Sequence, residues 1–285
     1  MKVVYWPQRT MTVAERGELA AAGKSIEGVV VPLQGCSDPG QWLVAPVEDL
    51  KSMGYQTSDM VSQTLMVVGC RRVWVQLWAA SNSPRTQLID QSGRDLQRRI
   101  AQLKSVGPYP KWDWDWLLDC ELYPYSPPNA PGVTSLDAWD ARPPNHDPYP
   151  FVERQSVYCW MRDMAPMVIA GSDRNRTLRE GFARYLRRGG LTPPRQNAPA
   201  LAFTLDTCEA DDPGLRFQKR HLKGSRLKPC PGVYAGTAPT AKSLTASLRR
   251  LQGYGAQYAY IYDCENALCT TAGAQVLLAA VRAVA

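Results

Sequence analysis

The chain contains eight short, apolar, β-rich runs, and nearly all of them are followed by a stretch with helical periodicity. The average spacing is about 36 residues per run (285/8), which is close to the length of a strand plus its helix. The runs are continuously apolar, as parallel strands covered on both faces should be. We therefore predict an α/β fold, a TIM-like (β/α)8 barrel forming a single domain over residues 1–285. The runs are Lys2–Trp6, Gly28–Leu33, Val73–Ala79, Trp116–Glu121, Met167–Ala170, Ala200–Asp206, Gly232–Gly236 and Gln257–Asp263.

The alternative architecture is an open, doubly wound sheet. Such sheets commonly carry a glycine-rich phosphate loop, but neither GxGxxG nor GxxxxGK[ST] follows the first run. A Pro-rich segment, residues 123–150, follows the fourth run without clear periodicity, and we expect it to be an insertion within the barrel domain.

Carboxylates gather where the predicted strands end, which in such barrels is the functional end. The fourth run ends with Asp119 and Glu121, the sixth with Asp206 and the eighth with Asp263. Alternate strand residues face the same side, so Asp119 and Glu121 should face the barrel mouth together. Paired carboxylates repel when both are ionised, which raises one pKa and favours a proton donor beside an ionised partner. We expect Asp119, Glu121 and Asp263 to be catalytic.

Aromatic residues accompany these acids, and flat rings suit stacking on sugar rings. We take as candidate substrate-binding residues Trp6, Trp78, Trp114, Tyr123, Tyr262 and Asp206. Core packing explains tryptophans and tyrosines equally well, and acids that follow strands often cap a helix or pair with arginine.

The strand end LLDCEL, residues 117–122, resembles the D-x-E strand end of family 25 lysozymes, TIM-like barrels that cleave peptidoglycan. The resemblance implies that Glu121 is the acid and that Asp263 is a further carboxylate of the mouth. The first run ends Tyr5-Trp6-Pro7-Gln8, where those lysozymes carry an aspartate.

A broader resemblance links the chain to glycoside-hydrolase-like barrels among phage tail components, some of which look inactive. Two functions therefore stand side by side. One is a glycoside hydrolase acting on a glycan such as peptidoglycan, and the other is a catalytically silent structural or adhesive component of a phage virion, with protein partners in a larger assembly.

The net charge is +7, with a dense basic cluster at residues 216–228. Nucleic-acid binding is a third hypothesis, but no reader module or aromatic interleaving accompanies the charge, so we do not expect it. Hydrophobic residues make up 45% of the chain and charged residues 21%, which excludes a disordered or fibrous chain.

Metal and cofactor chemistry are not expected. The eight cysteines form no CxxC motif, and the two histidines, His146 and His221, have no ligand spacing to them. We expect most of the cysteines to be buried free thiols; a disulfide or soft-metal cluster among Cys208, Cys230, Cys264 and Cys269 is the alternative.

The N-terminal apolar run has four residues, too short for the core of a signal peptide, and no stretch is long enough to span a membrane. We therefore expect synthesis in a cytoplasm without a signal peptide, with the virion as a further location.

Overall fold

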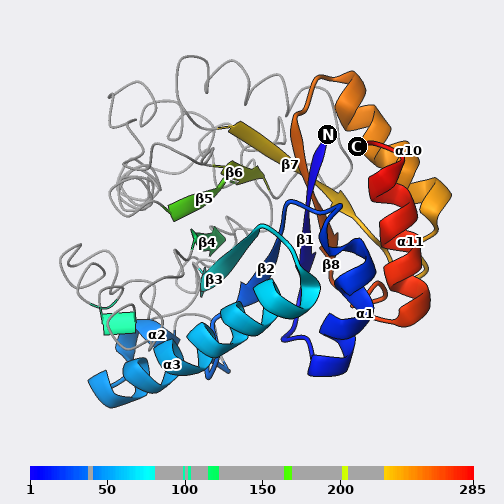
Figure 1. Ribbon diagram of the computed structural model, residues 1–285. Coiled ribbons are helices and arrows are strands. Elements are labelled where there is room, and N and C mark those ends of the chain that lie inside the picture. Colours follow the sequence, from blue (N-terminus) through cyan, green and yellow to red (C-terminus); the bar gives the residue numbers. More distant parts are fainter. Residues whose placement is uncertain are drawn as a thin grey trace, which may run out of the picture.

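The computed structural model describes residues 1–37, 41–80, 99, 102–103, 115–121, 164–168, 201–204 and 228–285. Eight strands pair in chain order and close into a barrel, with β8 paired to β1 (Figure 1). All neighbouring strands are parallel. The predicted α/β fold and TIM-like barrel are thus confirmed. The strands are β1 Lys2–Pro7, β2 Gly28–Pro32, β3 Arg72–Ala80, β4 Asp115–Glu121, β5 Met164–Val168, β6 Leu201–Thr204, β7 Lys228–Tyr234 and β8 Tyr258–Asp263.

Each strand coincides with or overlaps a predicted run, although two begin three or more residues earlier than expected. β5 starts at Met164 and β7 at Lys228. The early part of β7 contains Pro229 and Pro231, which hide its apolar character, yet both pair in register with β6. The Pro-rich segment at residues 123–150 lies outside the described residues, and the single-domain assignment remains a prediction.

The strands are apolar throughout because both of their faces are covered. In β1, Val4 and Trp6 point into the barrel, whereas Val3 and Tyr5 point outward to the helices. The same alternation runs along β8, where Tyr260 lies inside and Ile261 outside. Burial on both faces removes the alternating polar pattern of half-exposed strands.

Aromatic side chains fill the inside of the barrel. The Trp6 and Phe203 rings meet edge to face with their centroids 5.8 Å apart, and Phe203 meets Trp74 in the same way at 5.7 Å. Tyr260 packs against Trp6 at 5.3 Å. The interior is therefore a packed core, as in other barrels of this class, and ligands are expected at an end of the barrel.

The described helices lie outside the barrel. α1 (Val13–Gly23) begins with a capping box in which Thr12 and Glu15 satisfy each other's backbone N–H groups. α10 (Ala241–Gly253) and α11 (Thr271–Arg282) follow β7 and β8. The predicted helices after the first, seventh and eighth runs are thereby confirmed.

Between β2 and β3 the chain forms helices that the sequence pattern does not predict. They are α2 (Gln41–Val44), α3 (Val47–Gln63) and the π-helix η1 (Thr64–Val68). α3 buries small polar side chains such as Thr57, Ser58 and Ser62, so its buried face carries a weak apolar signal. Within the described part of the chain, no helix has the length and apolar character needed to cross a membrane.

Candidate functional site

The carboxyl ends of the strands define one end of the barrel, which we call the mouth. Parallel strands bring their last residues together there, and this is where barrels of this class carry their functional residues. On the described side, β7 ends at Tyr234, β8 at Asp263 and β1 at Pro7. The candidate site is therefore built from the last residues of these strands and of β4.

Three aromatic residues, Tyr234, Tyr262 and Trp6, form a row on neighbouring strands from solvent into the barrel; we call them the aromatic row. Tyr234 is 43% exposed, Tyr262 is half-buried and Trp6 is 1% exposed. The ring centroids of Tyr234 and Tyr262 lie 6.3 Å apart, and those of Tyr262 and Trp6 lie 5.7 Å apart. The row offers an exposed aromatic ring at the mouth, supported by buried rings beneath it.

Trp6 also brings a polar group into this region. Its Nε1 atom is buried and has no hydrogen-bond partner among the described residues. A buried donor without an acceptor costs free energy, so native structures rarely keep one without a reason. The Trp6 ring packs against the half-buried Tyr262 ring, which forms the next member of the row.

Tyr234 was not among the predicted site residues. Its hydroxyl lies 2.8 Å from the Cys264 thiol, on the loop that follows β8, and this contact holds the exposed ring beside Tyr262. The sequence contains a signal for this position, because Cys230, Gly232 and Tyr234 are alternate residues of one strand and therefore face the same side. Cys230 lies in the inner cluster, so Tyr234 is the inner-face position at the mouth end of β7.

The predicted acids Asp119 and Glu121 lie in β4, in register with Trp78 and Ala80 of β3. Together with Leu117, whose side chain is buried in the inner cluster, they are alternate residues of β4, so their positions are on the inner face of the strand. In a closed barrel of eight strands, β4 is four strands away from β8 in either direction. The backbone positions of the two acids are therefore across the barrel from Tyr262, and their side chains lie outside the described part of the structure.

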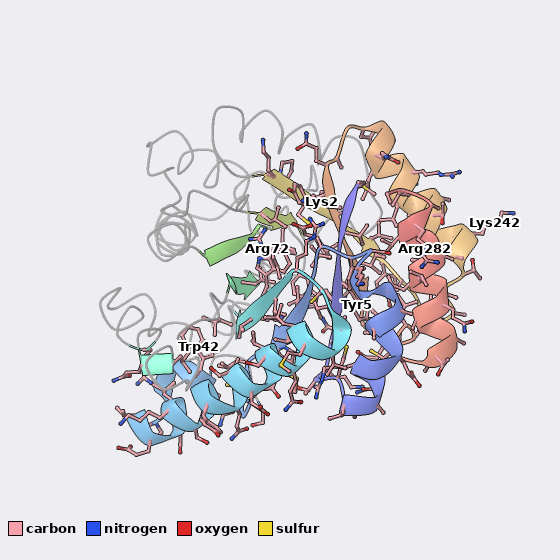
Figure 2. The ribbon with its side chains drawn as sticks, viewed as in Figure 1. Lys2, Tyr5, Trp42, Arg72, Lys242 and Arg282 are labelled. Atoms are coloured by element: carbon pink, nitrogen blue, oxygen red, sulfur yellow. The ribbon has the colours of Figure 1, made fainter. Side chains whose placement is uncertain are left out.

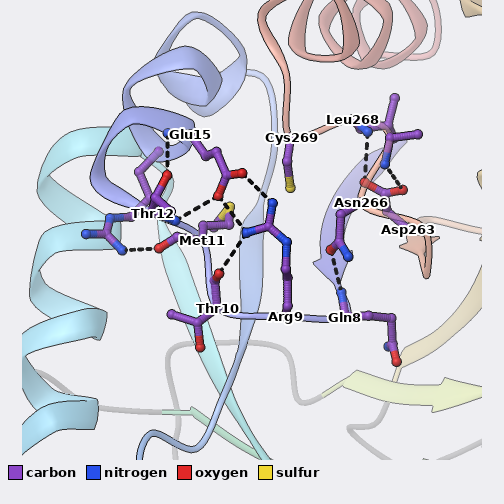
Figure 3. Close-up of polar contacts among 12 residues, drawn as sticks. Gln8, Arg9, Thr10, Met11, Thr12, Glu15, Asp263, Asn266, Leu268 and Cys269 are labelled. Atoms are coloured by element: carbon purple, nitrogen blue, oxygen red, sulfur yellow. Dashed lines mark hydrogen bonds and ion pairs between the residues drawn. The ribbon is translucent and has the colours of Figure 1, made fainter.

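The third predicted acid, Asp263, does not face the inside of the barrel. It is 0% exposed, and it alternates with Tyr262 so that it lies on the outer face, under the helix layer. Oδ2 accepts hydrogen bonds from the Tyr5 hydroxyl at 2.7 Å and the Leu268 N–H at 2.9 Å, and Oδ1 accepts one from the Ala267 N–H at 2.9 Å. Figure 3 shows the Asp263 carboxylate held by the backbone of the loop at Leu268. These contacts correct the expectation of a mouth carboxylate: Asp263 organises the loop that follows β8.

The loop after β8 is shaped by this carboxylate and by Asn266. Asn266 has a positive φ of 54°, a conformation that asparagine tolerates better than most residues. Its side-chain oxygen accepts a hydrogen bond from the Gln8 N–H at 3.2 Å, which links the loop to the end of β1 (Figure 3). The loop that carries Cys264 is therefore fixed both to the end of β1 and to β8.

Tyr5 and Cys269 complete the outer cluster around Asp263. The Tyr5 hydroxyl lies 3.0 Å from the Cys269 thiol. Burial, followed by the nearby Cys269 and Asp263, raises the pKa of Tyr5 far above its usual range, and burial also raises the pKa of Cys269. Both groups are therefore neutral at physiological pH, and the cluster carries one buried carboxylate stabilised by three donors.

The remaining predicted residues lie where the structure gives no side-chain description. Trp78 is in β3, but its side chain is outside the described part, and Trp114, Tyr123 and Asp206 lie wholly outside it. Among the described cysteines, Cys36, Cys70, Cys230, Cys264 and Cys269 are free thiols. The described residues contain no group of three or more His, Cys, Asp or Glu side chains that could hold a metal ion.

The closed parallel barrel, with candidate residues at the carboxyl ends of its strands, defines the chain as a TIM-like barrel. Comparison with solved structures agrees with this class. Methylaspartate ammonia lyase from Clostridium tetanomorphum superimposes with a TM-score of 0.53 at 7% identity, covering 100% of this chain and 58% of that one.

Two further solved structures are similar at a lower level. Malate synthase from Haloferax volcanii gives a TM-score of 0.47 at 9% identity, covering 98% of this chain and 73% of that one. A dihydrodipicolinate synthase family protein from Coccidioides immitis gives 0.42 at 12% identity, covering 90% and 65%.

These similarities concern the fold alone, and none of the three named proteins is a glycoside hydrolase or a phage protein. The chain spans 58% of the length of the lyase. No protein-family model and no curated protein sequence matches the chain.

Proposed function

We propose that the mouth of this barrel binds a glycan through the aromatic row. The observation that carries the proposal is Tyr234, an exposed ring at the functional end of the barrel with a second aromatic ring 6.3 Å away. A flat, partly exposed ring can cover the apolar C–H face of a sugar, and the contact of the Tyr234 hydroxyl with Cys264 holds this ring in place. The buried Trp6 ring supports the row from beneath, because it packs edge to face against Tyr262.

The acid positions on β4 make a hydrolytic version of this function the leading proposal. Glu121 would donate a proton to the leaving glycosidic oxygen, and Asp119 would act as the nucleophile or stabilise the positive charge on the sugar ring. The two positions are two residues apart in one strand, roughly 6.6 Å along it. They lie across the barrel from Tyr262, so a glycan chain held by the aromatic row would extend towards them. Peptidoglycan is the proposed substrate.

A second candidate is a barrel that binds a glycan without cleaving it. It is favoured by a specific observation: β1 ends in Trp6 and Pro7 without a carboxylate, and Asp263 is bound on the outer face. The described strand ends thus leave β4 as the main source of catalytic acids. Such a protein fits a structural or adhesive role, and its placement in a phage virion remains a prediction from the sequence.

Binding is tested with soluble peptidoglycan fragments and the change in intrinsic tryptophan fluorescence of the full chain. Replacing Tyr234 with alanine should weaken binding roughly tenfold, because stacking on one exposed ring is lost. Tyr55, an exposed tyrosine on α3 away from the strand ends, provides the matched control. Equal affinity in Tyr234→Ala and Tyr55→Ala would contradict glycan binding at this row.

Catalysis is tested separately by the release of reducing ends from peptidoglycan. If the hydrolytic proposal is right, Glu121→Gln abolishes release and leaves fragment binding intact, because the amide cannot donate the proton. Binding without hydrolysis by the unmodified chain would assign the protein to the second candidate.

A further inference from the structure

The two ends of the barrel differ in charge. Strands run from one end to the mouth, and the helices return, so strand starts and helix ends meet at the end opposite the mouth. We call this the base. Within the described residues it carries eight cations, and all of them except the half-buried Arg72 are exposed. They are Lys2, Lys24, Arg71, Arg72, Lys228, Arg249, Arg250 and Arg282.

Acids are nearly missing from the same end of the described structure. Glu27 is buried there and pairs with Lys2 at 3.3 Å, and Asp115 starts β4 with a side chain outside the described part. Acids concentrate instead on the mouth side, where Glu48 and Asp49 begin α3 and Glu265 follows β8. The polarity therefore follows the barrel axis.

Some of the cations at the base stabilise helix ends. Arg250 and Arg282 lie in the last turns of α10 and α11, where a cation offsets the partial negative charge of the helix end. The cations at the strand starts do not lie at helix ends, and Lys2 among them pairs with Glu27. Lys2 and Arg72 lie over the rings of Tyr258 and Trp74, at 5.7 and 4.6 Å from the centroids. Figure 2 shows both near the starts of their strands.

Two exposed apolar side chains adjoin these cations. Met66 is 75% exposed and Val67 is 37% exposed, both in η1, which leads through Gly69 directly into Arg71. Val68 is buried, and its backbone carbonyl packs against Gly23, next to Lys24. Methionine is a flexible apolar side chain that recurs at binding surfaces, and here it lies next to basic residues.

We propose that the base of the barrel docks on an anionic lipid surface. Lysine and arginine side chains would bind the headgroups, and Met66 with Val67 would enter the region between headgroups and acyl chains. Nucleic acid fits less well, since the exposed aromatic residues of the described structure, Tyr55 and Tyr234, are not at the base. This docking would leave the mouth facing away from the membrane, and it does not depend on what the mouth binds.

The test is co-sedimentation of the full chain with phosphatidylcholine vesicles, with and without phosphatidylglycerol. The chain should sediment only with the anionic vesicles, and binding should fall as salt is raised, because salt screens exposed charges. Lys24→Glu combined with Arg71→Glu should weaken binding by roughly tenfold or more. Arg71→Gln alone, with a smaller loss, serves if the double variant does not fold by circular dichroism.

The matched control reverses two exposed cations near the mouth, Lys51→Glu with Lys242→Glu, which changes the net charge equally. It should retain binding within about twofold, because those charges lie away from the docked face. Met66→Ser should lose the part of binding that persists at high salt. Three outcomes would overturn the proposal: equal binding to vesicles without phosphatidylglycerol, equal loss in the mouth-side control, or binding to an oligonucleotide but not to vesicles.

Discussion

The Tyr5 hydroxyl donates a 2.7 Å hydrogen bond to Asp263 Oδ2, which joins the first strand of the barrel to the last. The bond lies on the outer face, at the seam where β1 pairs with β8. Two backbone N–H groups of the following loop share the same carboxylate. One buried side chain therefore reinforces the pairing that closes the barrel and also shapes the following loop.

Replacing Asp263 with asparagine should destabilise the protein by about 2 kcal/mol, because charge-assisted hydrogen bonds are lost and an amide N–H₂ group faces other donors. Urea unfolding followed by circular dichroism measures the change. Glycan binding under conditions where the variant is folded should remain, since the side chain faces away from the mouth. A fully stable variant that has lost a hydrolytic activity would return Asp263 to the catalytic candidates.

Gly232 lies inside the barrel beneath the Tyr260 ring. A Cβ atom added there would lie 2.5 Å from Tyr260 Cζ and 2.6 Å from its hydroxyl oxygen, so the ring would have to move. We expect Gly232→Ala to cost about 1–3 kcal/mol of unfolding free energy through overpacking. Gly17→Ala is the control: its added Cβ meets nothing within 4 Å in α1, and it should stabilise the protein by about 0.5–1 kcal/mol. Thermal unfolding of both variants should shift in opposite directions.

Glu15 predicts a pH dependence of stability. The hydrogen bond from Arg9 lowers its pKa from the ordinary 4.5 to about 2. A lowered pKa stabilises the folded state above the unfolded pKa, so the contribution is present above about pH 4.5 and is lost as the pH falls towards about 2. After solvent screening we expect about 0.5–1 kcal/mol. Glu15→Gln should lose this amount at pH 7, and its stability should converge with that of the unmodified chain at low pH.

The described cysteines should differ in reactivity towards iodoacetamide in the folded protein. Burial raises the pKa of the Cys70 thiol to about 12, and burial raises the pKa values of Cys230 and Cys269. The thiolate is the reactive form, so these three should label slowly at neutral pH. Cys36 and Cys264 are half-buried and should label first. Peptide mapping by mass spectrometry provides the order, and fast labelling of Cys230 would contradict the packed barrel interior.

The strands were predictable because their burial on both faces leaves continuous apolar runs. In α1, the N-cap residue Thr12 and the glycine at position 23 are likewise local sequence signals for the two ends of the helix. α3 escaped prediction because its buried face includes Thr57, Ser58 and Ser62, whose burial depends on neighbours distant in the chain. Local pattern is informative only where the buried side chains are themselves apolar.

The candidate site was harder to predict for a related reason. A run that is apolar on both faces does not reveal which parity faces inward, so Asp263 could be assigned to the mouth although Tyr262 holds the inner position. The same ambiguity hid Tyr234, whose place beside Tyr262 is set by pairing between β7 and β8. Which alternate residues face the inside of the barrel is decided only when the strands pair in register and one face packs against the core.

Composition and the spacing of apolar runs by themselves determined that eight strands follow one another along the chain, because backbone and side-chain preferences act over a few residues. Closure of the sheet decided what those residues do. It places the Asp263 carboxylate on the outer face, where it binds Tyr5 of β1, and it places the exposed Tyr234 at the mouth. It also brings the cations of strand starts and helix ends together at the base. These positions depend on contacts between segments hundreds of residues apart, such as Tyr5 and Asp263, which no local stretch of sequence contains.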